Sequence, residues 1–127
     1  MCSTWGASGD QTLTADNQVT VSVNQVAAAD TLTVAATGCT FNFGTIALGS
    51  TAYTTATATF LGAGANKSTI TWTASTRTLT ITLGATASAA LGTVASSTAV
   101  YTPSTSIQNT SGIALGGTFS TGALTQF

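Results

Sequence analysis

The sequence predicts an all-β fold, an antiparallel β-sandwich of about seven to nine short strands. Apolar and hydroxyl side chains alternate along many short segments, which is the pattern of half-buried strands. Turn residues separate these segments at intervals of roughly 8–12 residues, a spacing typical of sandwiches and barrels. The chain is also rich in threonine and contains few of the residues that build surface helices, so little helix is expected.

One of the clearest strands is expected at residues 19–23, where Val19, Val21 and Val23 share one face and hydroxyl side chains occupy the other. The same reasoning predicts further strands at residues 31–34, 40–43, 53–60 and 93–101, with a last one from residue 118.

A β-hairpin gives the strongest local signal. Residues 69–73 and 78–82 both alternate, and four residues connect them. Ile70 and Trp72 are expected to face the core together with Leu79 and Ile81, while threonines face outward.

The whole chain, residues 1–127, is expected to form one domain, because its length suits a single core and it shows neither a repeat nor a break in composition. Residues 1–17 are expected to be a flexible or exchangeable N-terminal arm. The first five residues lack the charged and apolar regions of a signal peptide, so we expect a mature or excised segment.

Charge excludes several classes of partner. Only 4% of the residues are charged and the net charge is −1. Two cations cannot neutralise a nucleic-acid backbone or bind an anionic membrane, so neither partner is expected. No apolar stretch of about 18 residues is present, so no membrane insertion is expected. Such a surface suits a chain that is assembled, glycosylated or tethered outside the cell.

The two cysteines, Cys2 and Cys39, match no zinc or redox motif, and the chain has no histidine. In an oxidising compartment a Cys2–Cys39 disulfide would tie the N-terminal arm to the body. A buried Cys39 with a free Cys2, or a bridge between two chains, is the alternative.

No catalytic constellation is recognisable, so we expect no enzyme, no metal site and no cofactor. Histidine and glutamate are absent, and no aspartate belongs to a motif with a second carboxylate. A nucleophilic Lys67–Ser68 pair is outweighed by a solvated loop lysine. An isopeptide bond from Lys67 would need a buried carboxylic acid beside it, and none is expected there.

Three segments resemble bacterial Ig-like repeats of secreted cell-surface, S-layer-associated and fibre proteins. Residues 68–84 resemble their central hairpin, and residues 41–49, FNFGTIALG, are similar to an early stretch of such sandwiches. Residues 101–115 resemble their closing segment, in which a proline and an I-x-D-x-x-G-N turn precede the last strand. The resemblance implies an immunoglobulin-like sandwich. Gln108 or Asn109 stands at the acidic turn position, which disfavours calcium binding.

Composition and resemblance together predict a non-catalytic structural module of a microbial extracellular surface, pilus or fibre protein. It would act at the cell surface as a spacer, an adhesion unit or a self-assembling subunit. The expected partners are copies of itself or neighbouring repeats. The strand containing Val19, Val21 and Val23 has no charged gatekeeper, so it is a candidate for exchange between chains.

Glycans are further candidate partners. Asn66 and Asn109 begin two N-glycosylation sequons in predicted loops. The alternative function is a carbohydrate- or ice-binding β-sandwich module. Its evidence is the threonine rows of residues 69–73 and 78–82, together with four aromatic side chains suited to sugar stacking, Trp5, Trp72, Tyr53 and Tyr101. In the simpler interpretation, the threonines form the ordinary polar face of a sheet and Trp72 packs in the core.

Overall fold

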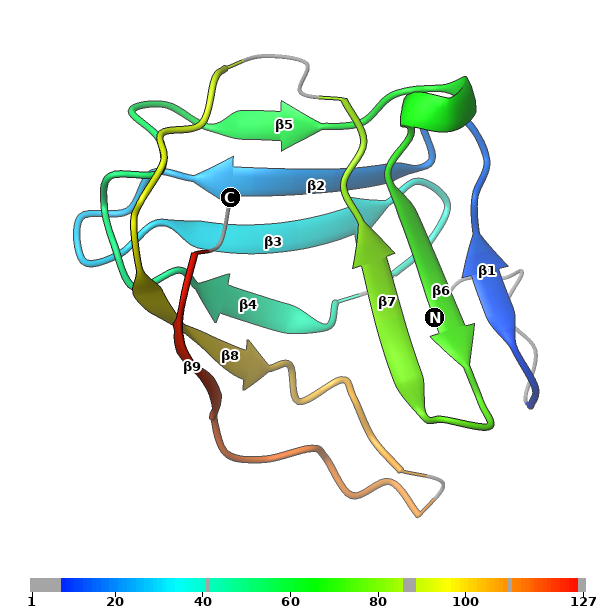
Figure 1. Cartoon of the computed structure of the whole chain (residues 1–127). Coiled ribbons are helices and arrows are strands. Elements are labelled where there is room, and N and C mark those ends of the chain that lie inside the picture. The colour runs from blue at the N-terminus through cyan, green and yellow to red at the C-terminus, as the bar shows by residue number, and fades with distance from the viewer. Residues whose placement is uncertain (1–7, 41, 86–88, 110, 126–127) are drawn as a thin grey trace.

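The computed structural model describes residues 8–40, 42–85, 89–109 and 111–125. It confirms the all-β prediction. The described residues form nine strands in two antiparallel sheets, with a single 3-10 turn, η1 (Gly64–Asn66), as their helical content (Figure 1).

The large sheet has six strands in the order β5-β2-β3-β4-β8-β9. Their bounds are β2 (Val19–Asn24), β3 (Thr31–Ala36), β4 (Gly44–Ala47), β5 (Ala58–Phe60), β8 (Ser97–Pro103) and β9 (Phe119–Leu124). Strands β2, β3 and β4 follow one another as neighbours, and β5 returns to lie beside β2. This is the Greek-key order found in most β-sandwiches, immunoglobulin-like ones included.

The small sheet has the order β1-β6-β7, with β1 (Gln11–Leu13), β6 (Thr69–Thr73) and β7 (Thr78–Thr82). Its strands run steeply across one end of the large sheet (Figure 1). Strands β6 and β7 are the predicted hairpin with the predicted bounds. Ile70 is fully buried, whereas Trp72 is only half-buried. Trp72 lies opposite Gln11 in β1, and this three-residue strand offers the indole little cover.

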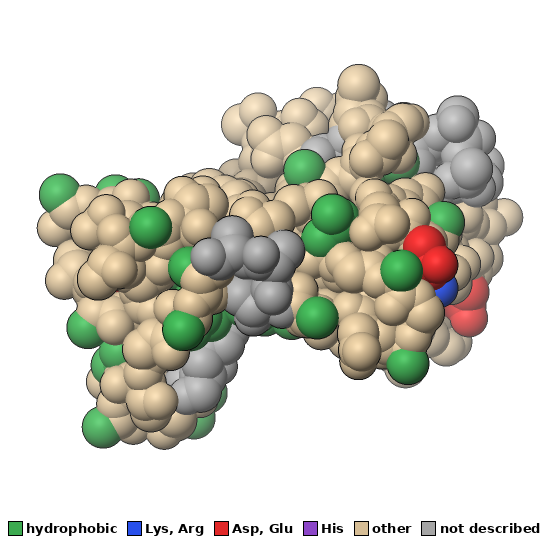
Figure 2. Space-filling model, turned by 90° about the horizontal axis from the view of Figure 1, so that it is seen from above, with side chains coloured by type: hydrophobic (Ala, Val, Ile, Leu, Met, Phe, Trp, Pro, Cys, Tyr) green, Lys and Arg blue, Asp and Glu red, His purple; other side chains and the backbone are tan. Residues whose placement is uncertain are grey.

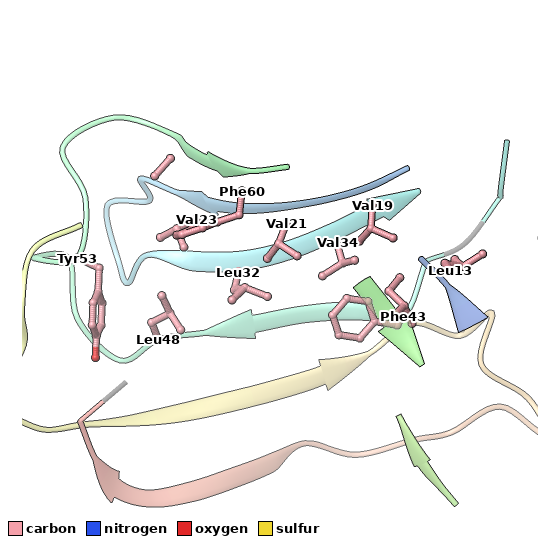
Figure 3. Close-up of a cluster of buried hydrophobic side chains, with 12 residues drawn as sticks. Leu13, Val19, Val21, Val23, Leu32, Val34, Phe43, Leu48, Tyr53 and Phe60 are labelled. Carbon is pink, nitrogen blue, oxygen red and sulfur yellow. The ribbon is translucent and has the colours of Figure 1, made fainter. Parts of the chain in front are cut away.

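The core lies between the two sheets, and alternation along the strands explains its composition. Val19, Val21 and Val23 of β2 are at most 1% exposed, and they point to the same side as Leu32 and Val34 of β3 (Figure 3). The buried cluster also contains residues from both sheets and the connecting segments, namely Leu13, Phe43, Leu48, Tyr53, Ala58, Phe60 and Ile70.

Two segments differ from the sequence-based prediction. The strand expected at residues 53–60 is formed only at Ala58–Phe60, because Tyr53 is buried from an irregular segment rather than from a strand. The strand expected at residues 40–43 lies further along the chain as β4. In both cases the alternating sequence pattern indicates which side chains are buried. A side chain can be buried without belonging to a hydrogen-bonded strand.

The predicted N-terminal arm includes a paired segment. Residues 11–13 form β1 against β6, and Leu13 is 1% exposed. Residues 1–7 lie outside the described part of the chain. The described end of the arm is therefore an integral strand of the small sheet.

Candidate functional site

Lys67 and Ser68, the candidate nucleophilic pair, are both engaged in structural contacts. Lys67 Nζ lies 3.0 Å from Asp16 Oδ1, in an ion pair on the surface. Ser68 is 1% exposed, and its hydroxyl donates to the Phe60 carbonyl at 3.0 Å and accepts from the Gly84 amide at 2.9 Å. Within the ranges that the structure describes, no three potential metal ligands come together.

Asp16 joins two loops at the end of the small sheet. Its Oδ1 accepts hydrogen bonds from Lys67 Nζ at 3.0 Å and from the Gly64 amide at 3.1 Å. The hydrogen bond from Lys67 has the largest effect and, with the Gly64 amide and the lysine charge, holds the pKa of Asp16 below its ordinary value of 3.8. Figure 2 shows charged side chains gathered at one end of the molecule.

A first prediction concerns acid stability. The folded pKa of Asp16 is below its unfolded value, so its contribution to stability is present above about pH 3.8 and is lost as the pH falls through the folded pKa. Asp16→Asn should therefore reduce the pH dependence of the urea midpoint below this value. The effect should be small and should shrink in salt, because the pair is exposed. An unchanged acid slope would contradict this role.

Among the described residues, Asp30 carries the one fully buried carboxyl group, with 0% exposure. Oδ2 accepts hydrogen bonds from the amides of Tyr53 and Thr54, each at 3.0 Å, and Oδ1 accepts one from Val26 at 3.3 Å. Next to it, the Tyr53 hydroxyl lies 2.6 Å from Ser97 Oγ. This polar group fixes the β2–β3 loop against the segment that follows β4.

The predicted disulfide is described only at one end. Cys39 is disulfide-bonded. Its predicted partner, Cys2, lies outside the described residues, so the pairing itself stays a prediction.

Both sequon asparagines are exposed. Asn66 ends η1, but Ser68 of its sequon is buried. The side-chain oxygen of Asn109 accepts hydrogen bonds from the amides of Ser111 at 2.9 Å and Ile113 at 3.0 Å. Thr110 of this sequon lies outside the described residues. Asn109 therefore shapes its turn with the oxygen that an aspartate would use.

The predicted exchange segment is an interior strand. Strand β2 pairs with β3 on one side and with β5 on the other, and Val19, Val21 and Val23 are all buried. Releasing β2 would expose the centre of the core. The outermost strands are β5 and β9 in the large sheet and β1 and β7 in the small one.

The threonine rows form direct cross-strand pairs. Thr69 pairs with Thr82, Thr71 with Thr80 and Thr73 with Thr78 on one face of the hairpin. Neither described tyrosine proposed for sugar stacking lies on this face. Tyr53 is fully buried in the core, Tyr101 belongs to the large sheet, and Trp5 lies outside the described residues.

The surface that sequence reasoning missed is residues 111–125, here called the C-terminal surface. Every described side chain in it is exposed. Five large hydrophobic side chains are exposed among the described residues, and this surface carries four of them: Ile113 (67%), Leu115 (41%), Phe119 (51%) and Leu124 (54%). The sequence contains no charged residue after Arg77. The C-terminal surface is therefore apolar, uncharged and at the edge of a sheet.

A β-bulge decides which way β9 presents its side chains. Phe119 and Leu124 are five positions apart, so a regular strand would place them on opposite faces. The register instead pairs Phe119 with Tyr101 and Leu124 with Ser97, with a shift between Thr98 and Val100. Tyr101 and Ser97 share one face of β8, so the bulge brings both hydrophobic side chains to the inner face of the sheet.

In the part of the chain that the structure describes, the small sheet does not extend over the inner face of β9 (Figure 1). Phe119 stacks on Tyr101, with ring centroids 6.2 Å apart, yet half of Phe119 stays exposed. The small sheet has three strands against six, and it covers the other end of the large sheet (Figure 1). Seen from above, the outline of the molecule is indented between its two ends, one of which carries the visible charged side chains (Figure 2).

Comparison with protein-family models, with curated proteins and with solved structures found no match to this chain. In the described part of the chain, no helix has the length and hydrophobicity needed to cross a membrane.

Proposed function

We propose that this chain is a non-catalytic structural module of a microbial extracellular surface or fibre protein. It acts there as a spacer, an adhesion unit or a self-assembling subunit. The observation that carries the proposal is the C-terminal surface, where an uncharged strand with exposed hydrophobic side chains ends the large sheet. Charge and proline, two of the means by which monomeric proteins protect such an edge, are absent from residues 111–125.

The proposed partners follow from the same surface. An exposed apolar patch on a sheet edge favours contact with another protein surface. Copies of the chain or neighbouring repeats of a longer protein are the partners that a nearly uncharged module can meet without desolvating charges. A glycan on Asn66, which is exposed beside the small sheet, would mark a face that remains open to solvent, whereas Asn109 lies next to the C-terminal surface.

A second candidate function is binding of ice or carbohydrate through the threonine face. Its support is the register, which places three threonine pairs side by side along β6 and β7. Cross-strand threonine pairs also stabilise ordinary sheets, which is why the structural role is preferred.

The two functions are separated by a ligand test. We expect the chain to give no signal on a glycan array and no inhibition of ice recrystallisation. If it does inhibit ice growth, and Thr80→Lys on the threonine face abolishes this while Thr98→Lys on β8 does not, the binding function replaces the structural one. Both threonines are exposed, so neither change should unfold the protein.

A further inference from the structure

We infer that β9 pairs antiparallel with β9 of a second copy of this chain, so that two large sheets join into one continuous sheet. The inference rests on the proposed structural role and names the partner and the contact. It follows from three properties of β9: its free edge, its lack of charged side chains and its register with β8.

The edge of β9 is free to accept a strand. Strand β9 is the last strand of the large sheet, and among the described residues it pairs only with β8. Residues 111–125 contain no lysine, glutamate or proline to block a further strand. Gly122 lies at the bulge, and a Cβ built there would meet nothing within 4 Å. Neither a side chain of Gly122 nor a neighbouring atom therefore fills the space beside this point.

Charge favours a second copy as the occupant. Residues 78–127 contain no charged side chain, whereas the charged residues at the surface lie on and around the small sheet: Asp10, Asp16 and Arg77, which are exposed, and Lys67, which is partly exposed. A contact through β9 therefore removes no charge from water. It also keeps the charges of two copies apart, while a charged peptide, nucleic acid or anionic membrane would find no counter-charge there.

The sequence of β9 complements itself. With a two-fold axis between Thr121 and Gly122, antiparallel pairing sets Phe119 opposite Leu124 of the second copy, and the reverse. The bulge has already placed both side chains on the inner face, so each exposed ring meets an exposed leucine. Directly opposite apolar side chains on one face stabilise strand pairs. Across the new strand pair, each Phe119 ring and its opposite Leu124 then bury part of their exposed surface against each other.

Light scattering after size-exclusion chromatography tests the inference with the full chain across a concentration series. We expect the mass of two chains, with non-reducing gel electrophoresis showing a single chain, since the contact is not a disulfide. Phe119→Lys and Leu124→Glu should each shift the protein to the mass of one chain. Thr80→Lys, on the edge strand of the small sheet, should leave the dimer intact.

Charge exchange tests the register. The double variant Phe119→Lys with Leu124→Glu sets each lysine opposite a glutamate of the second copy, so it should recover the dimer that each single change loses. A circular dichroism melt of every variant reports whether it remains folded.

The two conclusions fail separately. The β9 contact is overturned if the chain without substitutions has the mass of one chain. It is also overturned if both single variants remain dimers, or if the double variant has the mass of one chain. The glycan and ice assays bear on the proposed function whatever the oligomeric state.

Discussion

Asp30→Ala should destabilise the fold by about 3–5 kcal/mol. The change removes the acceptor for three amides, those of Val26, Tyr53 and Thr54, at a site with 0% exposure. Each buried donor left without a partner costs about 1–3 kcal/mol, and the contacts of the Tyr53 and Thr54 amides with Asp30 are buried. Urea unfolding followed by tryptophan fluorescence measures the loss.

Asp10→Ala is the matched control for Asp30→Ala. Asp10 is also an aspartate that accepts a backbone hydrogen bond, from the Ala74 amide at 2.8 Å, but it lies at the surface. Water replaces this acceptor, so the expected loss is below about 1 kcal/mol. Equal effects of the two changes would contradict the role given to Asp30.

Gly44→Ala should destabilise the protein by at least about 3 kcal/mol. Gly44 has a φ of 109°, and an added Cβ would lie 2.0 Å from the Thr102 carbonyl oxygen and 2.7 Å from the Ser104 amide nitrogen. The Thr102 oxygen belongs to β8 and the Ser104 nitrogen follows it, so these backbone atoms cannot move without opening the β4–β8 pair inside the large sheet. Thermal unfolding by circular dichroism measures the effect.

Gly112→Ala is the control that separates two causes of the destabilisation expected for Gly44→Ala, the steric clash of the added Cβ and the strain of a positive φ. Gly112 also has a positive φ, 78°, but a Cβ there would meet nothing within 4 Å. Only the backbone strain remains, so the expected loss is about 1–2 kcal/mol. A Gly44→Ala variant as stable as Gly112→Ala would show that β4 and β8 do not approach as closely as described.

Strands whose side chains alternate strictly were predictable from the sequence. The β6–β7 hairpin and β2 have strict alternation between a buried and a polar face, and their positions were predicted correctly. Tyr53 lies in a segment that reads as a strand, yet it is buried through a loop and a hydrogen bond to Ser97. This burial depends on a contact with a residue 44 positions away, and the alternation of neighbouring residues does not predict such a contact.

The C-terminal surface was only partly predictable. The sequence indicates a strand near Phe119 and shows that no charge follows Arg77. It does not show that the strand is outermost, because sheet order depends on pairing between distant segments. The sequence also does not predict the bulge opposite Ala99, although this bulge places Phe119 and Leu124 on the same face of the sheet. The valines of β2 alternate more clearly, which suggested an exchangeable strand, but they are buried in the core and β2 is not an edge strand.

The central claim is that this nearly uncharged sandwich assembles through β9, and contacts between copies test it most directly. Isotope-filtered NMR on an equal mixture of labelled and unlabelled chain detects only protons close to a neighbouring molecule. The account predicts intermolecular signals between Phe119 and Leu124 and along β9. Intermolecular signals confined to other strands, or none in a sample concentrated enough for the measurement, would contradict it.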